Sequence, residues 1–491
     1  MLLASSVVVP RRASALLVVL LCGCATLQTA GAATSSSDAV PGAVQYGVVL
    51  DCGSSGTRAN IYYWAAGGHA ITQLLPPKSE QHLLRTRPGI SLFAGNESGV
   101  DAYIGSLLRQ TQRWLPAARL GSTHVRAFAT AGMRLLTADV QAPIWRRVEA
   151  AITDAGFAFT PGDARTISGE REGIFNLIAL RHIYDEAGDA AASRMGALDL
   201  GGVSAQITFA PISGVVLDEA YDVSTGGDPP LRTRLYSHSY MRAGKDAALL
   251  RYAQRLSDDA GARRADGALA SPCHNLGYNT TFQLRCGAAP RRSCEKLLIG
   301  TGDFDACSAR VALLADMDRE CMLEPCAMNG DYQPSAAGVP FVATAGFFYT
   351  ANGLGLIGWD DPPKAISTAQ LAEVTRRFCA WPWSTLGAHV PIINEFTAGH
   401  CFSGAYVAMM LSAYGIPEDS TNVTYARLVG GYEATWTLGA QLWAHEHRGV
   451  SISRDEGLPT SAGDRPLGAY SESAPLPPGC STTPATYPRL G

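Results

Sequence analysis

Apolar and polar positions alternate along the chain in short blocks that predict strands and helices in turn. Apolar runs at 46–52 and 59–64 flank a Gly-Ser turn, which predicts a β-hairpin. Helical spacing follows over Val100–Leu115, then an apolar strand over Val125–Thr130 and a second helix over Ala142–Ala155. This alternation is typical of an α/β sandwich with a largely parallel or mixed sheet.

The strand–turn–strand pattern returns at Met195–Phe209. The first copy ends its apolar run near Asp51 and the second near Asp199, about one domain length later. We interpret the two copies as related halves of the fold that face each other across a cleft. Helical spacing at Glu433–His447 predicts one more helix near the end of the chain.

These patterns divide the chain into predicted domains. Domain I takes 44–165 together with 427–456, and domain II takes 166–426. Within domain II, the cysteine-rich section 273–326 is predicted to be an irregular insertion. Pro, Gly, Ser and Thr dominate 457–491, so we expect a disordered tail there.

The first residues have the pattern of a processing segment. Two arginines precede the apolar run 15–21, and small residues at 30–32 offer a cleavage site. We therefore predict a secretory signal at 1–32, a leader at 33–43, and a protein that is secreted or resides in the secretory-pathway lumen. The run is shorter than the ~20 residues that span a bilayer, so no stable membrane anchor is expected. A bacterial lipoprotein signal at Leu21-Cys22-Gly23-Cys24, where a Cys follows a small residue, is the alternative.

Composition limits the possible partners and the compartment. A net charge of −4 without basic clusters argues against nucleic-acid binding. Most of the 12 cysteines lie between Cys273 and Cys401 without zinc-type spacing, which favours disulfides in an oxidising compartment. Glycosylation sequons at Asn96, Asn279 and Asn422 are compatible with the same route. The sequence leaves the oligomeric state open.

The two turns have the composition of anion-binding loops. Asp51 is followed by Gly-Ser-Ser-Gly, and Asp199 is followed closely by Gly201 and Gly202. Glycines let backbone N–H groups approach an anion, and hydroxyls add donors. A carboxylate beside such amides needs a cation, and Mg²⁺ or Ca²⁺ held through water is the usual solution. The pair of turns therefore predicts two loops that face one polyphosphate.

Two further segments carry candidate catalytic groups. Glu172 lies at the expected start of a helix, where most carboxylates are simply solvated and favoured by the helix dipole. Beside two phosphate loops, however, it is the candidate to orient and deprotonate a water that attacks the terminal phosphorus. Thr130 ends a strand, and its hydroxyl is a candidate for the γ-phosphate or the attacking water. The alternative for this turn is purely structural, with Met133 in the core.

The order of these motifs resembles the apyrase family, the nucleoside triphosphate diphosphohydrolases. The resemblance covers about 44–443 and implies an α/β, actin-like (ASKHA, RNase H-like) two-domain fold. Such a fold has duplicated mixed sheets flanked by helices and an interdomain cleft for the nucleotide phosphates. The five matching boxes are Asp51–Arg58, Ala129–Arg134, Gly169–Phe175, Leu198–Gln206 and, more loosely, Phe396–Tyr406.

The resemblance also implies an activity. Nucleoside tri- and diphosphates would be hydrolysed to the monophosphate by direct attack of water, with Mg²⁺ or Ca²⁺ held by Asp51 and Asp199 through water. Glu172 takes the position of the catalytic base, and Ser204 and Gln206 place the water. The phosphate-binding positions are Ser54, Ser55, Gly56, Thr57, Arg58, Gly202, Val203 and Ser204.

The nucleobase and the disulfides follow the family pattern less closely. Phe348 or Tyr349 fits one side of the aromatic sandwich that holds the base, and His400 stands where a second aromatic is usual. His400 is otherwise interpreted as a surface residue. By the same resemblance, Cys52 is a buried thiol and Cys480 lacks an evident partner. The implied disulfides are Cys321–Cys326, Cys379–Cys401, and an interlocked pair Cys273–Cys294 and Cys286–Cys307, although the sequence alone leaves the connectivity open.

Two alternative functions share some of these features. Exopolyphosphatases and guanosine pentaphosphate phosphatases have the paired loops and the glutamate, but usually Glu-Ala where this chain has Glu172-Gly173. A non-hydrolytic nucleotide-binding protein of the actin fold would not need Glu172 together with Ser204 and Gln206. Hydrolysis of nucleotides is therefore the leading hypothesis.

Overall fold

The computed structural model describes the chain from Val44 to Arg454 with short gaps. The described ranges are 44–68, 70–189, 192–212, 214–216, 219–225, 231–286, 293–390, 393–445 and 451–454. The predicted signal, leader and tail, and with them Cys22 and Cys480, lie outside these residues.

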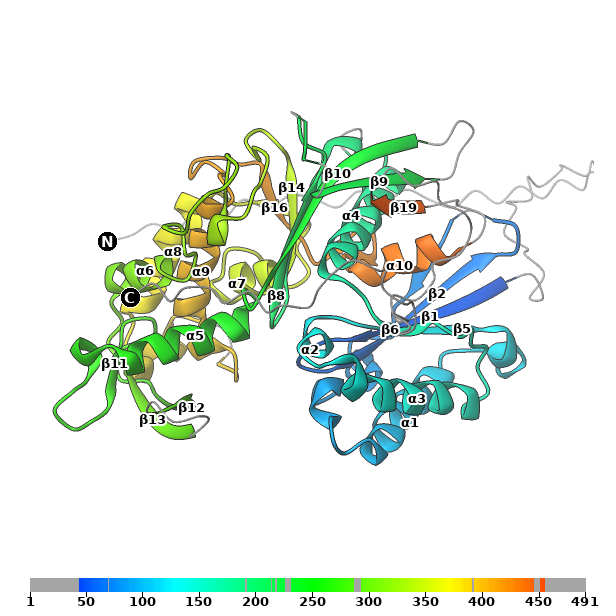
Figure 1. Cartoon of the computed structure of the whole chain (residues 1–491), viewed down its shortest axis with the longest axis horizontal. Helices are drawn as coiled ribbons and strands as arrows, with labels where there is room; N and C mark the ends of the chain where they lie inside the picture. The colour runs from blue at the N-terminus through cyan, green and yellow to red at the C-terminus, as the bar shows by residue number, and fades with distance from the viewer. Residues whose placement is uncertain are drawn as a thin grey trace, which may run out of the picture. The chain divides into compact units, whose positions relative to one another are not determined.

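The first sheet has the strand order β3-β2-β1-β5-β6, with β4 paired to β2. Figure 1 labels its strands β1, β2, β5 and β6. β1 is antiparallel to β2 and parallel to β5, and β5 is parallel to β6, so the sheet is mixed. The predicted hairpin is confirmed, as is the strand that follows it. The strands are β1 (Val44–Cys52), β2 (Thr57–Ala65), β3 (Thr72–Leu74), β4 (Arg85–Thr86), β5 (His124–Ala129) and β6 (Ala164–Thr166).

Alternation along β1 places side chains on both faces of this sheet. Val48 and Leu50 pack against helices α1 (Ser98–Gln112) and α3 (Ala138–Asp154), which confirm the two predicted helices. Val49 belongs to a different core cluster on the opposite face. Strand β1 is thus buried on both sides, which holds the loop that follows it in place.

The second sheet has the order β15-β16-β14-β7-β8-β10-β9-β19. Its centre repeats the first sheet, because β7 is antiparallel to β8 and parallel to β14. The expected duplication of a mixed sheet is therefore present. The strands are β7 (Gly196–Leu200), β8 (Ser204–Phe209), β9 (Ala220–Thr225), β10 (Leu231–Met241), β14 (Phe341–Ala345), β15 (Lys364–Ala365), β16 (Val423–Tyr425) and β19 (Ser451–Arg454).

Helix α4 (Gly169–Glu186) packs on the second sheet and contacts the first (Figure 1). It begins at Gly169 because the Ser168 side chain accepts a hydrogen bond from the backbone N–H of Arg171. Phe175 on this helix lies near both Phe128 of β5 and Trp443 of α10 (Trp436–Ala444). Helix α4 therefore joins the two sheets through one apolar core.

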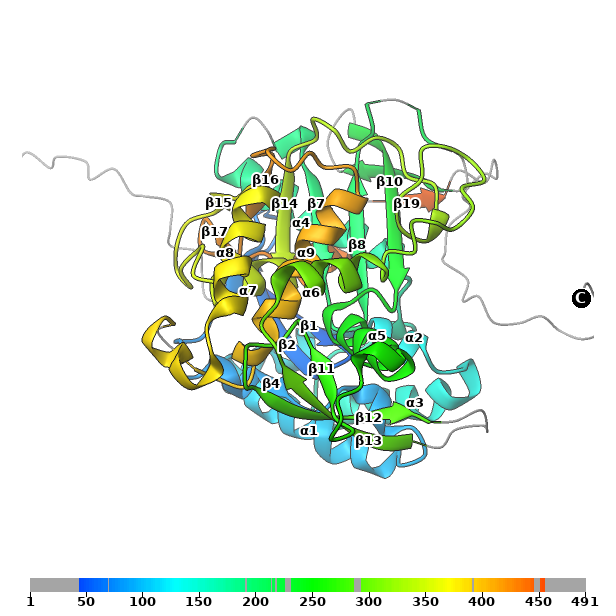
Figure 2. The ribbon, with the colours of Figure 1, turned by 90° about the vertical axis from the view of Figure 1, so that its left-hand side faces the viewer.

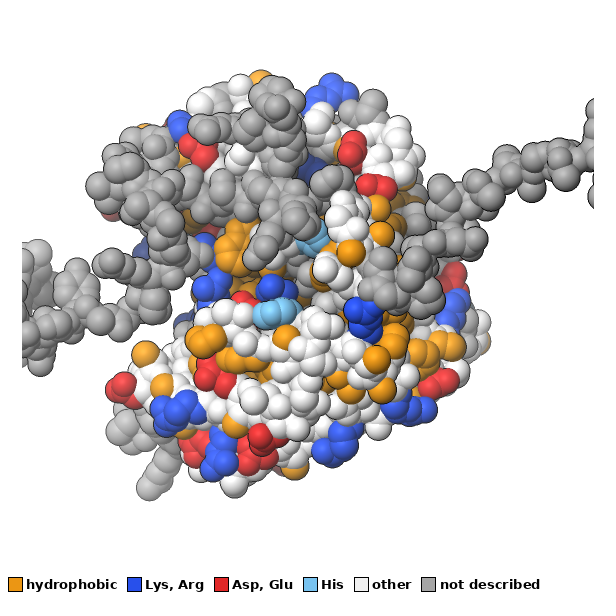
Figure 3. Space-filling view, turned by 90° about the vertical axis from the view of Figure 1, so that its right-hand side faces the viewer, with side chains coloured by type: hydrophobic (Ala, Val, Ile, Leu, Met, Phe, Trp, Pro, Cys, Tyr) orange, Lys and Arg blue, Asp and Glu red, His pale blue; other side chains and the backbone are white. Residues whose placement is uncertain are grey.

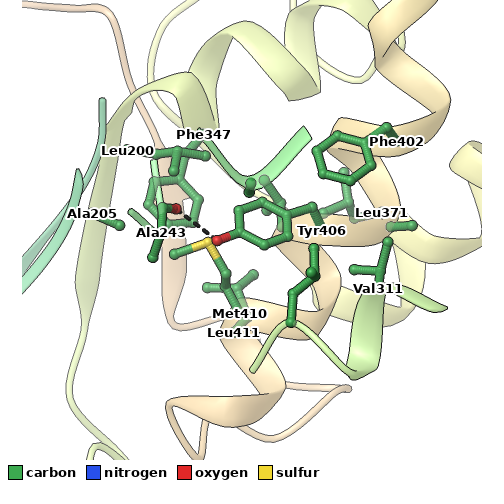
Figure 4. Close-up of a cluster of buried hydrophobic side chains, with 14 of the residues drawn as sticks. Leu200, Ala205, Ala243, Val311, Phe347, Leu371, Phe402, Tyr406, Met410 and Leu411 are labelled. Carbon is green, nitrogen blue, oxygen red and sulfur yellow. Dashed lines mark hydrogen bonds between the residues drawn. The ribbon is translucent and has the colours of Figure 1, made fainter. Parts of the chain in front are cut away.

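The other face of the second sheet is covered by helices (Figure 2). A hydrophobic core lies between these helices and the sheet. Tyr406 is buried in this core and donates a hydrogen bond of 2.6 Å to the carbonyl of Ala243 (Figure 4). Phe347 and Phe402 pack in the same core. These helices are α5 (Lys245–Asp258), α6 (Phe304–Ala312), α7 (Gly346–Gly353), α8 (Thr368–Ala380) and α9 (His400–Ala413).

Three details differ from the sequence-based expectations. The predicted helix at 433–447 begins only at Trp436, because Thr435 before it has extended backbone angles. The section 273–326 is not irregular throughout, since it contains helix α6 and strands β12 (Asn279–Arg285) and β13 (Ser293–Gly300). Strand β13 pairs with β12 on one side and with β11 (Leu269–Ser271) on the other. Strand β19, assigned above to domain I, pairs with β9 at the edge of the second sheet.

The disulfide connectivity is also partly corrected. Cys321–Cys326 and Cys379–Cys401 form as the resemblance implies. The interlocked pairs do not, because the structure joins Cys273 to Cys307 and Cys286 to Cys294. The β12–β13 hairpin explains the difference, since its register places Cys294 opposite Leu284 and brings Cys286 to the same end.

Among the residues that the structure describes, no helix is both long and apolar enough to cross a membrane. On the face drawn in Figure 3, Lys and Arg side chains are interspersed with Asp and Glu, in keeping with the small net charge of −4.

Candidate active site

Two equivalent turns carry the predicted loops. Asp51 is the last residue but one of β1, and Asp199 is the last but one of β7. In the hairpin registers, Asp51 pairs with Arg58 and Asp199 pairs with Gln206. The duplicated topology therefore places the two aspartates at equivalent positions, each directly before a small-residue turn.

The two turns meet at Ser54. A Cβ atom added to Gly202 of the second loop would lie 2.7 Å from the Ser54 Oγ. One added to Gly132, in the turn after β5, would lie 3.0 Å from the Ser54 Cα. The approach to the Ser54 backbone favours glycine at 132, and glycine at 202 leaves room for the Ser54 hydroxyl. The structure thus brings together three of the boxes that the sequence singled out.

Three carboxylates share this region. Burial raises the pKa of Asp51 to about 6, that of Asp199 to about 7 and that of Glu172 to about 8. The charge of Asp51 raises the pKa of both Asp199 and Glu172 further, and Asp199 also raises that of Glu172. A divalent cation near Asp51 and Asp199 would relieve this burial of like charge.

The donor set fits a hard cation held mainly by water. Across the described part of the chain, no cluster of three His, Cys, Asp or Glu side chains is close enough to coordinate a metal directly. Asp51 and Asp199 supply two carboxylates, which suit Mg²⁺ or Ca²⁺ when water completes the coordination sphere.

Glu172 lies in the first turn of α4 and is 6% exposed. Its Oε2 atom accepts a hydrogen bond from Arg134 Nη2 and another, of 3.2 Å, from Gln206 Nε2. Arg134 opposes the effect of burial and lowers the pKa of Glu172. The carboxylate is therefore fixed by two donors, one from the turn after β5 and one from β8.

The residues expected to place the water are also buried. Ser204 and Gln206 belong to β8, and Gln206 Nε2 donates to Ser204 Oγ at 2.8 Å. Thr130 precedes the short helix α2 (Ala131–Arg134), and its carbonyl accepts from the N–H groups of that turn, while its side chain makes no capping bond. Met133 is buried in the core, as the structural interpretation of this turn expected.

Two residues of the first loop lie differently from the simplest expectation. The Thr57 side chain is buried and accepts a hydrogen bond of 3.0 Å from Tyr103, so its hydroxyl belongs to the core and only its backbone can face a ligand. Arg58 lies close enough to Asp51 and Glu433 to interact with both charges. It is thus positioned beside the carboxylate rather than in open solvent.

The aromatic candidates separate clearly. Phe348 is only 1% exposed and packs in the core, whereas Tyr349 is partly exposed and stacks on Trp359 at 5.9 Å between ring centroids. His400 lies against Gly353 and meets the Phe378 ring at 6.0 Å, edge to face. The structure therefore favours Tyr349 over Phe348 as a surface for the nucleobase.

Sequence reasoning gave no role to Arg134 or Trp359. Arg134 stands at the end of the second box, but its pairing with Glu172 depends on the approach of α2 to α4. Trp359 lies in the loop after α7 and is 45% exposed. The only sign of it in the sequence was an isolated tryptophan.

Comparisons with known proteins show which family the chain resembles. Residues 38–452 match the GDA1/CD39 (nucleoside phosphatase) family. "Probable apyrase 3" of Arabidopsis thaliana is 31% identical over 411 residues, covering 81% of this chain and 82% of the relative. "Ectonucleoside triphosphate diphosphohydrolase 1" of Mus musculus is 28% identical, covering 82% and 81%.

A solved structure supports the fold. The nucleoside triphosphate hydrolase of Neospora caninum aligns with a TM-score of 0.59 at 18% identity, covering 82% of this chain and 93% of that one. At this identity the match concerns the fold alone, and it agrees with the expected actin-like architecture.

Proposed function

The chain belongs to the GDA1/CD39 (nucleoside phosphatase) family, and on this premise we propose how its site hydrolyses nucleoside tri- and diphosphates to the monophosphate. The observation that carries the proposal is the position of Glu172. Its buried carboxylate is held by Arg134 and Gln206, and it shares one electrostatic environment with Asp51 and Asp199.

The terminal phosphate would lie where the two loops meet at Ser54. Backbone N–H groups of the loops and the hydroxyls of Ser54 and Ser55 bind its oxygens, with Gly202 and Val203 opposite. Asp51 and Asp199 would hold Mg²⁺ or Ca²⁺ through water. When bound, the cation neutralises phosphate charge and favours in-line attack.

Glu172 then acts as the general base. Both of its hydrogen bonds in the described structure go to Oε2, which leaves Oε1 to accept a proton from the attacking water. Ser204, Gln206 and Thr130 orient that water. Because the water attacks phosphorus directly, no phosphoenzyme forms. The raised pKa of about 8 suits a base that works near neutral pH once a cation lowers it.

The nucleobase would stack on Tyr349, beside Trp359. The Arg427 guanidinium lies over the Trp359 ring, 4.6 Å from its centroid, and Trp359 in turn stacks on Tyr349. This cation–π contact holds the Trp359 ring in place beside Tyr349. His400 lies with Phe378 and Gly353, so we do not pair it with Tyr349 in this proposal.

We also propose a secreted or secretory-lumen location. The four disulfides in the described part of the chain suit an oxidising compartment. The sequon residues Asn96, Asn279 and Asn422 are all exposed and accessible to glycosylation. Expression in a eukaryotic secretory host, followed by N-terminal sequencing of the mature protein, tests cleavage near 30–32.

The central experiment measures phosphate release from a panel of nucleoside tri- and diphosphates and from polyphosphate. We expect release from nucleotides, loss on chelation, and recovery with Mg²⁺ or Ca²⁺. Glu172→Gln should abolish release while binding of a non-hydrolysable nucleotide persists. If Glu172→Gln released phosphate at the parent rate, Glu172 would not be the catalytic base. If polyphosphate were preferred over nucleotides, the proposed substrate class would be wrong.

A further inference from the structure

Ser239 connects the two side chains that hold Glu172. It lies on β10, directly opposite Gln206 in the antiparallel register with β8. Its Oγ atom lies 3.0 Å from Gln206 Nε2 and 3.4 Å from Arg134 Nη1. Gln206 and Arg134 therefore share two acceptors, Ser239 Oγ and Glu172 Oε2.

This arrangement determines which way the Gln206 amide points. Its Nε2 atom lies within hydrogen-bond distance of three oxygens, those of Glu172, Ser204 and Ser239, so its two N–H groups are shared among three acceptors. Its Oε1 atom is buried without a hydrogen-bond partner in the described structure. The reverse orientation would place Oε1 about as close to the Glu172 carboxylate as Nε2 is now, which is repulsive. The buried Oε1 atom is thus an acceptor left for a ligand.

We propose that Ser239 is a positioning residue for hydrolysis, an inference that rests on the function proposed above. By accepting from Arg134 and Gln206, it fixes both donors on Glu172 and turns Gln206 Oε1 toward the attacking water. Ser239 acts through these side chains and does not touch the reacting atoms.

The start of α4 is shaped to admit this contact. Gly169, the first residue of the helix, lies so close to Ser239 that a Cβ atom at 169 would overlap the Ser239 side chain. Glycine at this position lets the first turn of α4 reach β10. Three residues later, the same turn presents Glu172 to Gln206 and Arg134.

Ser237 offers a matched control on the same strand. It lies two residues before Ser239 and so on the same face of β10. Its hydroxyl bonds to Thr208 at 2.7 Å and to the carbonyl of Glu170 at 3.0 Å, and no bond joins it to Glu172, Gln206 or Arg134. Both serines lie against α4, and Ser237 is the more deeply buried of the two, so Ser237→Ala controls for the loss of a buried hydroxyl beside this helix.

The test compares Ser239→Ala with Ser237→Ala in the full chain, with ATP and ADP as substrates. Loss of a hydrogen bond that orients a catalytic group should lower kcat roughly tenfold in Ser239→Ala and leave KM within about twofold. Ser237→Ala should keep kcat within about twofold. Equal kcat in the two variants would overturn the inference.

A double-mutant cycle separates positioning from a general structural effect. In a Gln206→Ala background, Ser239→Ala should lower kcat by clearly less than tenfold, because its contact with Gln206 is already lost and only its contact with Arg134 remains. A full, independent loss in that background would contradict the inference. Should Ser239→Ala fail to fold, Ser239→Cys keeps a weaker acceptor in the same place and gives the same comparison. An active Glu172→Gln would instead refute the proposed function itself.

Discussion

Arg134 and Glu172 form a buried ion pair between the turn after β5 and the start of α4. Their side chains are 13% and 8% exposed, and the pair joins a residue beside the first phosphate loop to the proposed catalytic base. Burial and the neighbouring carboxylates raise the pKa of Glu172, and Arg134 is the group that lowers it. The charge state of the base therefore depends on this pair.

Replacing Arg134 should shift the pH dependence of hydrolysis. In Arg134→Met the pKa of Glu172 loses its main lowering influence and rises above about 8, while Asp199 and Asp51 continue to raise it. A base must be deprotonated to act, so the acidic limb of the kcat profile should move to higher pH. Activity at pH 7 should fall more than activity at pH 9.

The control for this prediction is Arg147→Met. Arg147 of α3 forms an exposed ion pair with Asp101 of α1 at 3.1 Å, and its loss should leave the profile unchanged. Removing one partner of a buried pair also destabilises a protein, by about 3–5 kcal/mol. Profiles are therefore measured below the unfolding temperature of each variant. An acidic limb that does not move would refute the role of Arg134.

The sequence predicted the parts of the site that are local. Asp51 and Asp199 each stand at the end of an apolar strand before a glycine-rich turn, so pattern and residue type together single them out as candidates. The burial of the Thr57 side chain also follows from strand alternation. Thr57 pairs with Cys52 across the hairpin, so the two side chains lie on the same face of the sheet, and both are buried.

The parts that the sequence did not predict depend on contacts between distant elements. The contact between Arg134 and Glu172 joins α2 to α4, and Ser239 reaches both Gln206 and Arg134 only because β10 pairs with β8. The disulfide pairing of Cys286 is another case, since it follows from the register of the β12–β13 hairpin. The spacing of residues along the sequence does not show which distant elements come into contact in the folded chain.

Metal dependence should respond to the two aspartates. Asp51→Asn and Asp199→Asn keep the size of the side chain but remove a charge that would hold the cation's waters. In each variant we expect the metal concentration that gives half-maximal activity to rise roughly tenfold, because one anionic group that holds the cation is lost. Asp101→Asn, an exposed carboxylate paired with Arg147, is the control. Unchanged titrations with Mg²⁺ and Ca²⁺ would exclude both residues from the metal site.

Peptide mapping without reduction tests the disulfide connectivity. Trypsin should leave peptide 265–285 linked to 297–310 through Cys273 and Cys307, and peptide 286–291 linked to 293–296 through Cys286 and Cys294. The interlocked pairing would instead link 265–285 to 293–296. Removing the Cys273–Cys307 bridge, by Cys273→Ala with Cys307→Ala, should lower the free energy of unfolding by about 2–4 kcal/mol.

A side chain at Gly202 should weaken phosphate binding. The Cβ atom of Gly202→Ala would lie 2.7 Å from Ser54 Oγ and 2.9 Å from Asp246 Oδ2, and both are ends of flexible side chains that can move aside. The protein should therefore fold, but the Ser54 hydroxyl would leave its place at the meeting point of the loops. We expect KM for ATP to rise by roughly tenfold, as overpacking by one methyl group costs about 1–3 kcal/mol. Gly121→Ala is the matched control, because no atom lies within 4 Å of its added Cβ. If Gly202→Ala and Gly121→Ala gave the same KM, Ser54 would not be a phosphate ligand and the two loops would not form one clamp.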